Sequence, residues 1–122
     1  NRLLKNNSVD VVVTEPYLGP YLKKSLNKQQ AIKIKSRLES MYKQFFESLT
    51  SVIKRNGLVV FVLPMFKTNS NDIIVINLKE FIKDKYSICK ICEFVDLPVK
   101  YYGINKKIIR QIVVLKTNNN LL

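Results

Sequence analysis

The most informative run of residues in this chain is Val9-Asp10-Val11-Val12-Val13-Thr14-Glu15-Pro16-Tyr17-Leu18-Gly19-Pro20. Its β-branched first half predicts a buried parallel strand over Val9–Val13, because five residues are too few and too branched for a helix. The acid, prolines, aromatic residue and glycine that follow are typical of a functional loop at the carboxyl end of a strand. Ligands of open α/β sheets bind at that edge, so this loop is the first candidate for a site.

The residues after this loop predict a long amphipathic helix. Apolar residues spaced three and four apart indicate about 25 helical residues with one apolar stripe. The stripe consists of Leu38, Met41, Tyr42, Phe45, Leu49, Val52 and Ile53. We expect the helix to end at Asn56-Gly57, with the cations Lys54 and Arg55 in its last turn, where they suit the helix dipole.

A second apolar strand is predicted over Leu58–Leu63, closed by Pro64. The loop over 65–72 that follows would lie at the same edge of the sheet as the first loop. Met65 and Phe66 open this second loop, where they are either part of the wall of a neighbouring pocket or ordinary core residues.

The rest of the chain predicts a short helix and two further strands. Asn77 and Glu80 have the spacing of a capping box, which predicts a helix over Leu78–Lys85. Strands over Tyr86–Phe94 and Lys107–Lys116 complete the order β-α-β-α-β-β. We therefore predict an α/β fold with a parallel sheet covered on both faces and an antiparallel last strand.

One terminal strand of this sheet would have nothing on its far side, so the sheet resembles half of a larger one. Residues 1–117 are expected to form one partial domain, and residues 118–122 a loose polar tail.

The charge of the chain is strongly positive. Lys and Arg total 21 against 9 acids, a net charge of +12, which would attract phosphate backbones or anionic membranes. The chain has 17 Lys but 4 Arg, together with 12 Asn and 13 Ile, which is the bias expected of a genome rich in A and T codons. The charge therefore indicates either nucleic-acid contact or solvated lysines.

Cysteine usage and hydropathy narrow the class of protein. Cys89 and Cys92 form a C-x-x-C pair, but the chain has no histidine, so we expect no metal and two reduced structural thiols. No export signal is recognisable at Asn1–Ser8, and no apolar run approaches the roughly 20 residues that cross a bilayer. A cytoplasmic location without membrane contact is the resulting expectation.

The first loop has the chemistry to hold an amino group. A carboxylate at Glu15 and rigid carbonyls around Pro16 would accept both hydrogens of an exocyclic amino group on a nucleobase, and Tyr17 offers a stacking face. Transfer of a methyl group to such a nitrogen needs positioning more than a base. The lack of histidine and of a glycine-rich loop argues against hydrolases and kinases.

The run Thr14-Glu15-Pro16-Tyr17-Leu18-Gly19 resembles the Asp-Pro-Pro-Tyr-type motif of S-adenosylmethionine-dependent amino-methyltransferases. It looks closest to the Thr-Asp-Pro-Pro-Tyr-Gly run of the tRNA guanine-N2 methyltransferases, at the end of their fourth strand. Residues 52–64 are similar to the Leu-Lys-Pro-Gly-Gly stretch that opens the fifth strand, and Ile108–Leu115 fits the final hairpin. The resemblance implies the C-terminal half of a class I (Rossmann-like) methyltransferase sheet.

The resemblance also implies S-adenosylmethionine as cofactor and RNA, most specifically tRNA, as partner. The family's cofactor-binding glycine loop and acid have no counterpart here, so an N-terminal half of the same domain is expected before Asn1. DNA as substrate stays open, because the amino-group chemistry is the same.

Two alignments with the family motif are available. Anchoring on Thr14 and Gly19 places Glu15 at the acid, Pro16 and Tyr17 at the prolines, and Leu18 at the aromatic position. Anchoring on Pro16-Tyr17 places Thr14 at the acid instead. We prefer the first alignment, because an acid then accepts the amino hydrogens.

Cations follow the motif closely. Lys23 and Lys24 would either guide an RNA backbone or simply be solvated, as would the later Lys28, Lys33, Lys35 and Arg37. Two other functions remain open for the whole chain. One is a non-catalytic, basic RNA-binding or subunit-docking module derived from a truncated methyltransferase, and the other is an unrelated α/β ligand-binding domain.

Overall fold

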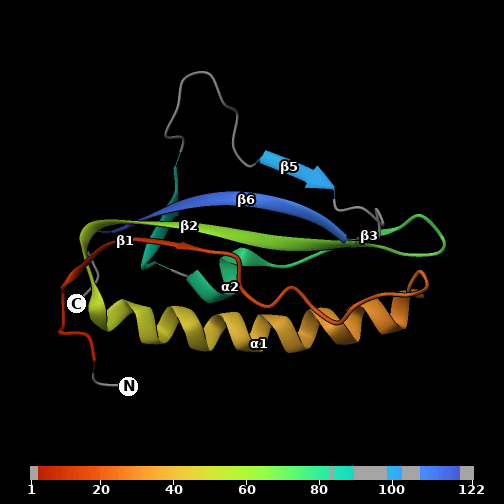
Figure 1. The fold of residues 1–122 in the computed structure, drawn as a ribbon, viewed down its shortest axis with the longest axis horizontal. Helices are drawn as coiled ribbons and strands as arrows, with labels where there is room; N and C mark the ends of the chain where they lie inside the picture. Colours follow the sequence, from red (N-terminus) through yellow and green to blue (C-terminus); the bar gives the residue numbers. More distant parts are fainter. Residues whose placement is uncertain (1–2, 83, 90–98, 103–107, 119–122) are drawn as a thin grey trace.

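A mixed six-stranded sheet lies on one long helix in the computed structural model, which describes residues 3–82, 84–89, 99–102 and 108–118 (Figure 1). The strands are β1 (Val9–Thr14), β2 (Ile53–Lys67), β3 (Ile73–Val75), β4 (Tyr86–Ile88), β5 (Val99–Tyr102) and β6 (Ile108–Thr117). The helices are α1 (Lys28–Val52) and α2 (Leu78–Ile82). The α/β class is confirmed.

The strand order along the sheet is β1-β2-β6-β4, with β3 beside β2 and β5 beside β6. β1 and β2 are parallel, whereas β6 is antiparallel to both β2 and β4. The predicted antiparallel last strand is therefore confirmed, displaced by one residue from its predicted bounds.

Helix α1 has the 25 residues that its apolar spacing predicts. Its start is fixed by a capping box, in which the Asn27 side chain accepts from the Gln30 N–H at 2.8 Å and the Gln30 side chain accepts from the Asn27 N–H at 3.1 Å. Its buried face packs through Tyr42 and Phe46 on Phe61 of β2, with ring centroids 5.2 and 5.1 Å apart. Met41, assigned to the buried stripe, is in fact 47% exposed.

The helix ends four residues earlier than predicted, and β2 begins at once. Ile53 is extended and fully buried, so its apolar side chain joins the sheet core instead of a further helical turn. Lys54 and Arg55 therefore belong to β2 rather than to the last helical turn. Asn56 has the predicted left-handed conformation, with φ 61°, but inside the irregular first part of β2.

That irregular part is held by the last residue of β6. The Thr117 hydroxyl, which is buried, accepts from the Gly57 N–H and donates to the Lys54 carbonyl, both at 2.9 Å. A Cβ at Gly57 would lie 2.6 Å from Ile53 Cγ1 and 2.8 Å from the Lys54 carbonyl oxygen. Glycine is required there for space.

Strand β2 also runs further than predicted at its other end, through Pro64 to Lys67. The predicted loop over 65–72 is shortened to the connection between Lys67 and Ile73. β1 stops pairing with β2 at Phe61 and β3 starts at Met65, so Pro64 has a ladder neighbour only on the β6 side. A proline is tolerated in a strand where one side has no partner.

Helices α1 and α2 lie on the same side of the sheet (Figure 1). The prediction of helices on both faces is therefore wrong for the described residues. On the opposite face, Val11 and Val13 of β1 are 53% and 73% exposed. β1 is thus a half-exposed edge strand rather than a buried one, because β2 is its one ladder partner in the described chain.

In the second half of the chain, the described helix α2 and strand β4 are shorter than predicted. α2 ends at Ile82, and the Asn77 N–H donates to the Glu39 carboxylate of α1 at 2.7 Å rather than to Glu80. β4 covers the first three residues of the predicted strand over 86–94, and residues 90–94 lie outside the described residues.

Among the described helices, none combines the length and apolar character that a bilayer crossing requires. Asn118, assigned to a loose tail, donates from its backbone to the Lys85 carbonyl at 2.8 Å and from its side chain to the Asp84 carbonyl at 2.7 Å.

Candidate functional site

The candidate site begins where β1 ends, with an ion pair across the sheet. Nε of Arg110 donates to Oε1 of Glu15 at 3.1 Å. The two side chains are 29% and 51% exposed, so the pair is partly sheltered. Within the described residues, Glu15 has no other partner, and its second carboxylate oxygen is free to accept a hydrogen bond.

The Glu15 side chain lies on the sheet face opposite α1. Side chains alternate between the faces of a strand, and Glu15 has the parity of Val13, which is exposed away from the helix. Arg110 reaches the same carboxylate from β6, since its Nε lies 3.1 Å from Oε1 of Glu15. The carboxylate of Glu15 is therefore not covered by either described helix.

The loop after Glu15 is attached to α1 through a backbone carbonyl. The Tyr42 hydroxyl donates to the Tyr17 carbonyl oxygen at 2.7 Å. Burial raises the pKa of the Tyr42 phenol well above its ordinary value, which keeps it a neutral donor. The Tyr17 ring is 56% exposed, so one carbonyl of the loop is fixed in the core while an aromatic face remains available for stacking.

Gly19 brings the loop onto the end of β2. Its φ of 112° lies in the region that favours glycine, and a Cβ there would touch Ile34 and Phe66 at 3.4 Å. Thr14 is half-buried in the β1 ladder opposite Phe61, and Leu18 and Pro16 are half-buried. The loop is therefore fixed at two points, Tyr17 and Gly19.

Met65 and Phe66 belong to β2 and not to a loop, and both are buried. Phe66 supports Gly19 from below, so its contact with the motif is through the core. Their burial agrees with the alternative that they are core residues rather than part of a pocket wall.

Lys23 and Lys24 are exposed on the connection between the motif and α1. That connection ends beside β2, where Leu26 pairs with Thr68 and the Asn69 N–H donates to the Leu26 carbonyl at 2.8 Å. The first turn of α1 contains no acid. Cations near a helix amino terminus are unfavourable for the helix dipole, so the positive charge here is not explained by helix stability.

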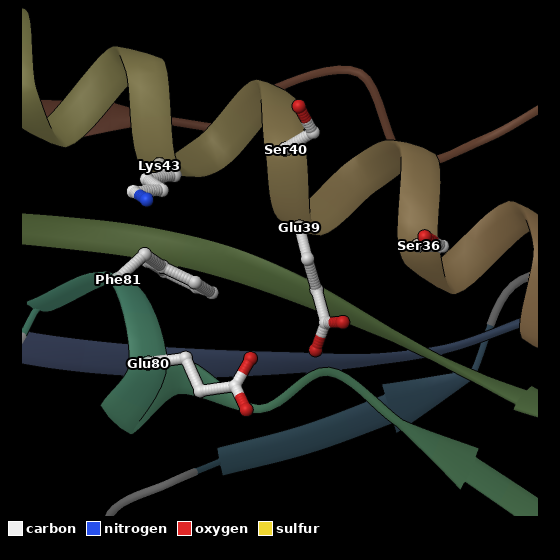
Figure 2. A pocket seen from close by; sticks show the side chains of 6 residues that line it. All are labelled: Ser36, Glu39, Ser40, Lys43, Glu80 and Phe81. Atoms are coloured by element: carbon white, nitrogen blue, oxygen red, sulfur yellow. The ribbon is translucent and has the colours of Figure 1, made fainter.

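The described hollows lie elsewhere, along the flank of α1 that faces β3, α2 and β4. One of about 500 Å³ is lined by Ser36, Glu39, Ser40, Lys43, Glu80 and Phe81 (Figure 2). Glu39 extends from α1 toward α2 in this view, consistent with its hydrogen bond to the Asn77 N–H. The Glu39 carboxylate thus links α1 to the residue before α2. Glu15 does not line this hollow, nor the hollow beside Ile32, nor the one beside Tyr86.

Two residues of the site were missed from the sequence, Arg110 and Tyr42. Arg110 interrupts the apolar residues of the predicted strand between Ile109 and Ile112, next to Gln111, and a charge at such a place is a signal of a functional or paired group. Tyr42 was recognised as a core residue, but nothing in the helical spacing indicates that its hydroxyl reaches the motif loop.

No group of three or more metal-ligating side chains occurs among the residues that the structure describes. In sequence comparisons, no protein-family model matches this chain, and no curated protein matches it.

Proposed function

We propose that this chain is the substrate-holding half of an S-adenosylmethionine-dependent methyltransferase that acts on an exocyclic amino group of a nucleobase. Guanine N2 in tRNA is the most specific form of the proposal, on the resemblance of the motif. The observation that carries it is the Glu15 carboxylate, which follows β1 directly, is anchored through one oxygen and keeps the other available.

The fold supports the proposal at the level of topology. The parallel pair β1 and β2 with an antiparallel closing strand β6 agrees with the arrangement that the resemblance implies. β1 has one ladder partner among the described residues, so its other edge is open to a strand of the N-terminal half that the resemblance implies.

Each motif residue has a role in holding the substrate. The free oxygen of Glu15 accepts an N–H of the amino group, which orients the nitrogen. Pro16 limits the conformations between the acid and Tyr17, and the exposed Tyr17 ring stacks on the base. Exposed Lys23 and Lys24 contact the phosphate backbone of the RNA.

The described residues do not form a site for S-adenosylmethionine by themselves. Gly19 is packed against Ile34 and Phe66, and Gly57 against Ile53, so neither provides the open glycine loop that a nucleotide-like cofactor needs. We therefore assign the cofactor to an N-terminal half and derive no step through it from this chain.

The test is Glu15→Ala in the full-length protein, with transfer of a labelled methyl group to RNA as the readout. We expect about a 100-fold or greater loss of transfer, since misplacing a reacting group by about 1 Å costs that much, with cofactor binding retained. Unchanged transfer would refute the role of Glu15. Tight binding of the cofactor to the isolated 122 residues would refute the division into halves.

The second candidate is a non-catalytic RNA-binding module, and the exposed cations before α1 favour it. The two functions differ in the full-length protein: the module binds RNA with a strong salt dependence but transfers no methyl group. A glycine-rich loop upstream of Asn1 would favour the enzyme.

A further inference from the structure

We propose that Arg110 is a positioning residue for Glu15: it holds the carboxylate in one orientation over β2 so that the second oxygen meets the substrate amino group. This inference rests on the proposed function. It assigns to the closing strand β6 a part in a site that the motif alone locates on β1.

The pair joins two strands that are not neighbours. β1 and β6 each lie beside β2, at about 4.8 Å per strand spacing, so they are roughly 10 Å apart. Thr14, the residue before Glu15, pairs with Phe61 of β2, and Arg110 pairs with Pro64. The Glu15–Arg110 ion pair therefore crosses β2 at residues 62–64. A side chain as long as arginine is needed to reach across that strand.

The segment beneath the pair is closed to solvent. Val62 is 9% exposed and Pro64 is buried, although neither described helix lies on this face. Toward the amino end of the same face, Val13 is 73% exposed. On β6, by contrast, Val114 of this face is 5% exposed, so the exposed part of the face lies on the edge strand β1.

An ion pair at the other end of β1 provides a direct comparison. Lys54 Nζ lies 3.1 Å from Asp10 Oδ1, the same separation as in the Glu15 pair, but it joins neighbouring strands. Its side chains are 47% and 74% exposed, against 29% and 51% for Arg110 and Glu15. Exposed ion pairs contribute little to the stability of the fold. If breaking the Arg110–Glu15 pair lowers activity and breaking the Lys54–Asp10 pair does not, the effect is one of positioning and not of stability.

The guanidinium suits this task better than an ammonium group. Arginine donates from a planar group in fixed directions, whereas lysine is a point charge on a flexible stem. Contact of Nε with Oε1 therefore limits rotation of the carboxylate as well as neutralising it.

The experiment measures methyl transfer to RNA by the full-length protein carrying Arg110→Met, Arg110→Lys, Glu15→Ala or the double change Glu15→Ala with Arg110→Met. We expect Arg110→Met to lower kcat about tenfold with cofactor affinity unchanged, and Arg110→Lys to recover part of the loss. The double variant should be no worse than Glu15→Ala alone, because Arg110 acts through Glu15.

The matched control is Lys54→Met, which breaks the other pair and should leave kcat within twofold of the wild type. Full activity of Arg110→Met, or losses that multiply in the double variant, would overturn the role of Arg110 while the proposed function stands. Full activity of Glu15→Ala would instead overturn the proposed function.

If Arg110→Met does not fold, a variant with the two charges exchanged tests the same proposal. Glu15→Arg combined with Arg110→Glu keeps an ion pair at the same place, so the variant should fold but transfer no methyl group. Transfer at the wild-type rate by this variant would overturn the proposal, because the acid would then work equally well from β6.

Discussion

The two ends of the β1–β2 pair are built differently. At the amino end, α1 runs directly into β2, and the Thr117 hydroxyl fills the hydrogen bonds of an irregular segment around Gly57. At the carboxyl end, single contacts from Tyr42, Phe66 and Arg110 hold an exposed loop. The first end pairs the Gly57 N–H and the Lys54 carbonyl through one buried hydroxyl, whereas the second leaves a carboxylate oxygen and an aromatic face available, which is what a binding site requires.

The largest effect on stability is expected at Gly57, at the amino end of the β1–β2 pair. We expect Gly57→Ala to lower the free energy of unfolding by about 2–3 kcal/mol, because the new methyl group meets a backbone carbonyl oxygen at 2.8 Å and Ile53 at 2.6 Å. Urea unfolding measures the change. A loss below about 0.5 kcal/mol would show that the amino end adapts easily and is not the rigid end.

Thr117→Val tests the hydroxyl that closes the same segment. The variant keeps the shape but leaves the Gly57 N–H and the Lys54 carbonyl without their partner, so we expect a loss of about 1–3 kcal/mol. Thr117→Ser retains the hydroxyl and should recover most of this loss in the same unfolding measurement. Equal losses in the two variants would mean that the methyl group, which valine keeps and serine lacks, contributes as much as the hydroxyl.

At the carboxyl end, Tyr42→Phe removes the hydrogen bond to the motif loop. We expect a stability loss of about 1 kcal/mol and faster proteolysis within the loop over 15–26. Tyr86→Phe is the matched control, since its hydroxyl lies 3.2 Å from Thr50 and does not touch the loop. Equal proteolysis of the two variants would mean that Tyr42 does not hold the loop.

The same phenol gives a pH dependence. Burial raises the pKa of Tyr42 in the folded state, so its neutral form contributes stability that is complete below the unfolded pKa of about 10. That contribution is lost as the pH rises above this value. We expect stability of the wild type to fall more steeply than that of Tyr42→Phe between pH 10 and 11, measured by denaturant unfolding at each pH.

The smallest effects are expected for the two ion pairs. Asp10→Asn and Glu15→Gln should each change stability by less than about 1 kcal/mol, because both pairs are partly exposed and screened by salt. Methyl transfer by the full-length protein distinguishes the two ends, because Glu15→Gln should lower the rate of transfer and Asp10→Asn should not. A similar loss in Asp10→Asn would mean that the two ends do not differ in function.

Long periodic segments of the fold were predictable from the sequence. β1, α1 and β6 are correct because their apolar patterns are strong and local. The end of α1 was wrong because Ile53 gains more from the sheet core than from another helical turn. The strand through Pro64 was missed because its tolerance depends on where β1 and β3 stop, which is a tertiary property.

For the site, the sequence located the loop but not what holds it. Glu15 and Tyr17 are identifiable from their place after a β-branched run. Arg110 is 95 residues from Glu15 along the chain, and no local pattern reports that separation. The capping box predicted at Asn77 placed the start of α2 correctly at Leu78, but its second bond was wrong for a similar reason, since the Asn77 N–H donates to Glu39 of α1 and not to Glu80.

The pairing of β2 with β6 has a consequence for synthesis on the ribosome. Val60 lies opposite Val114, so the central strand waits for a partner made roughly fifty residues later. At translation rates of about 5–20 residues per second, this delay lasts about 3–10 s. The edge of an apolar strand stays unpaired throughout that interval, which exposes the nascent chain to edge-to-edge association.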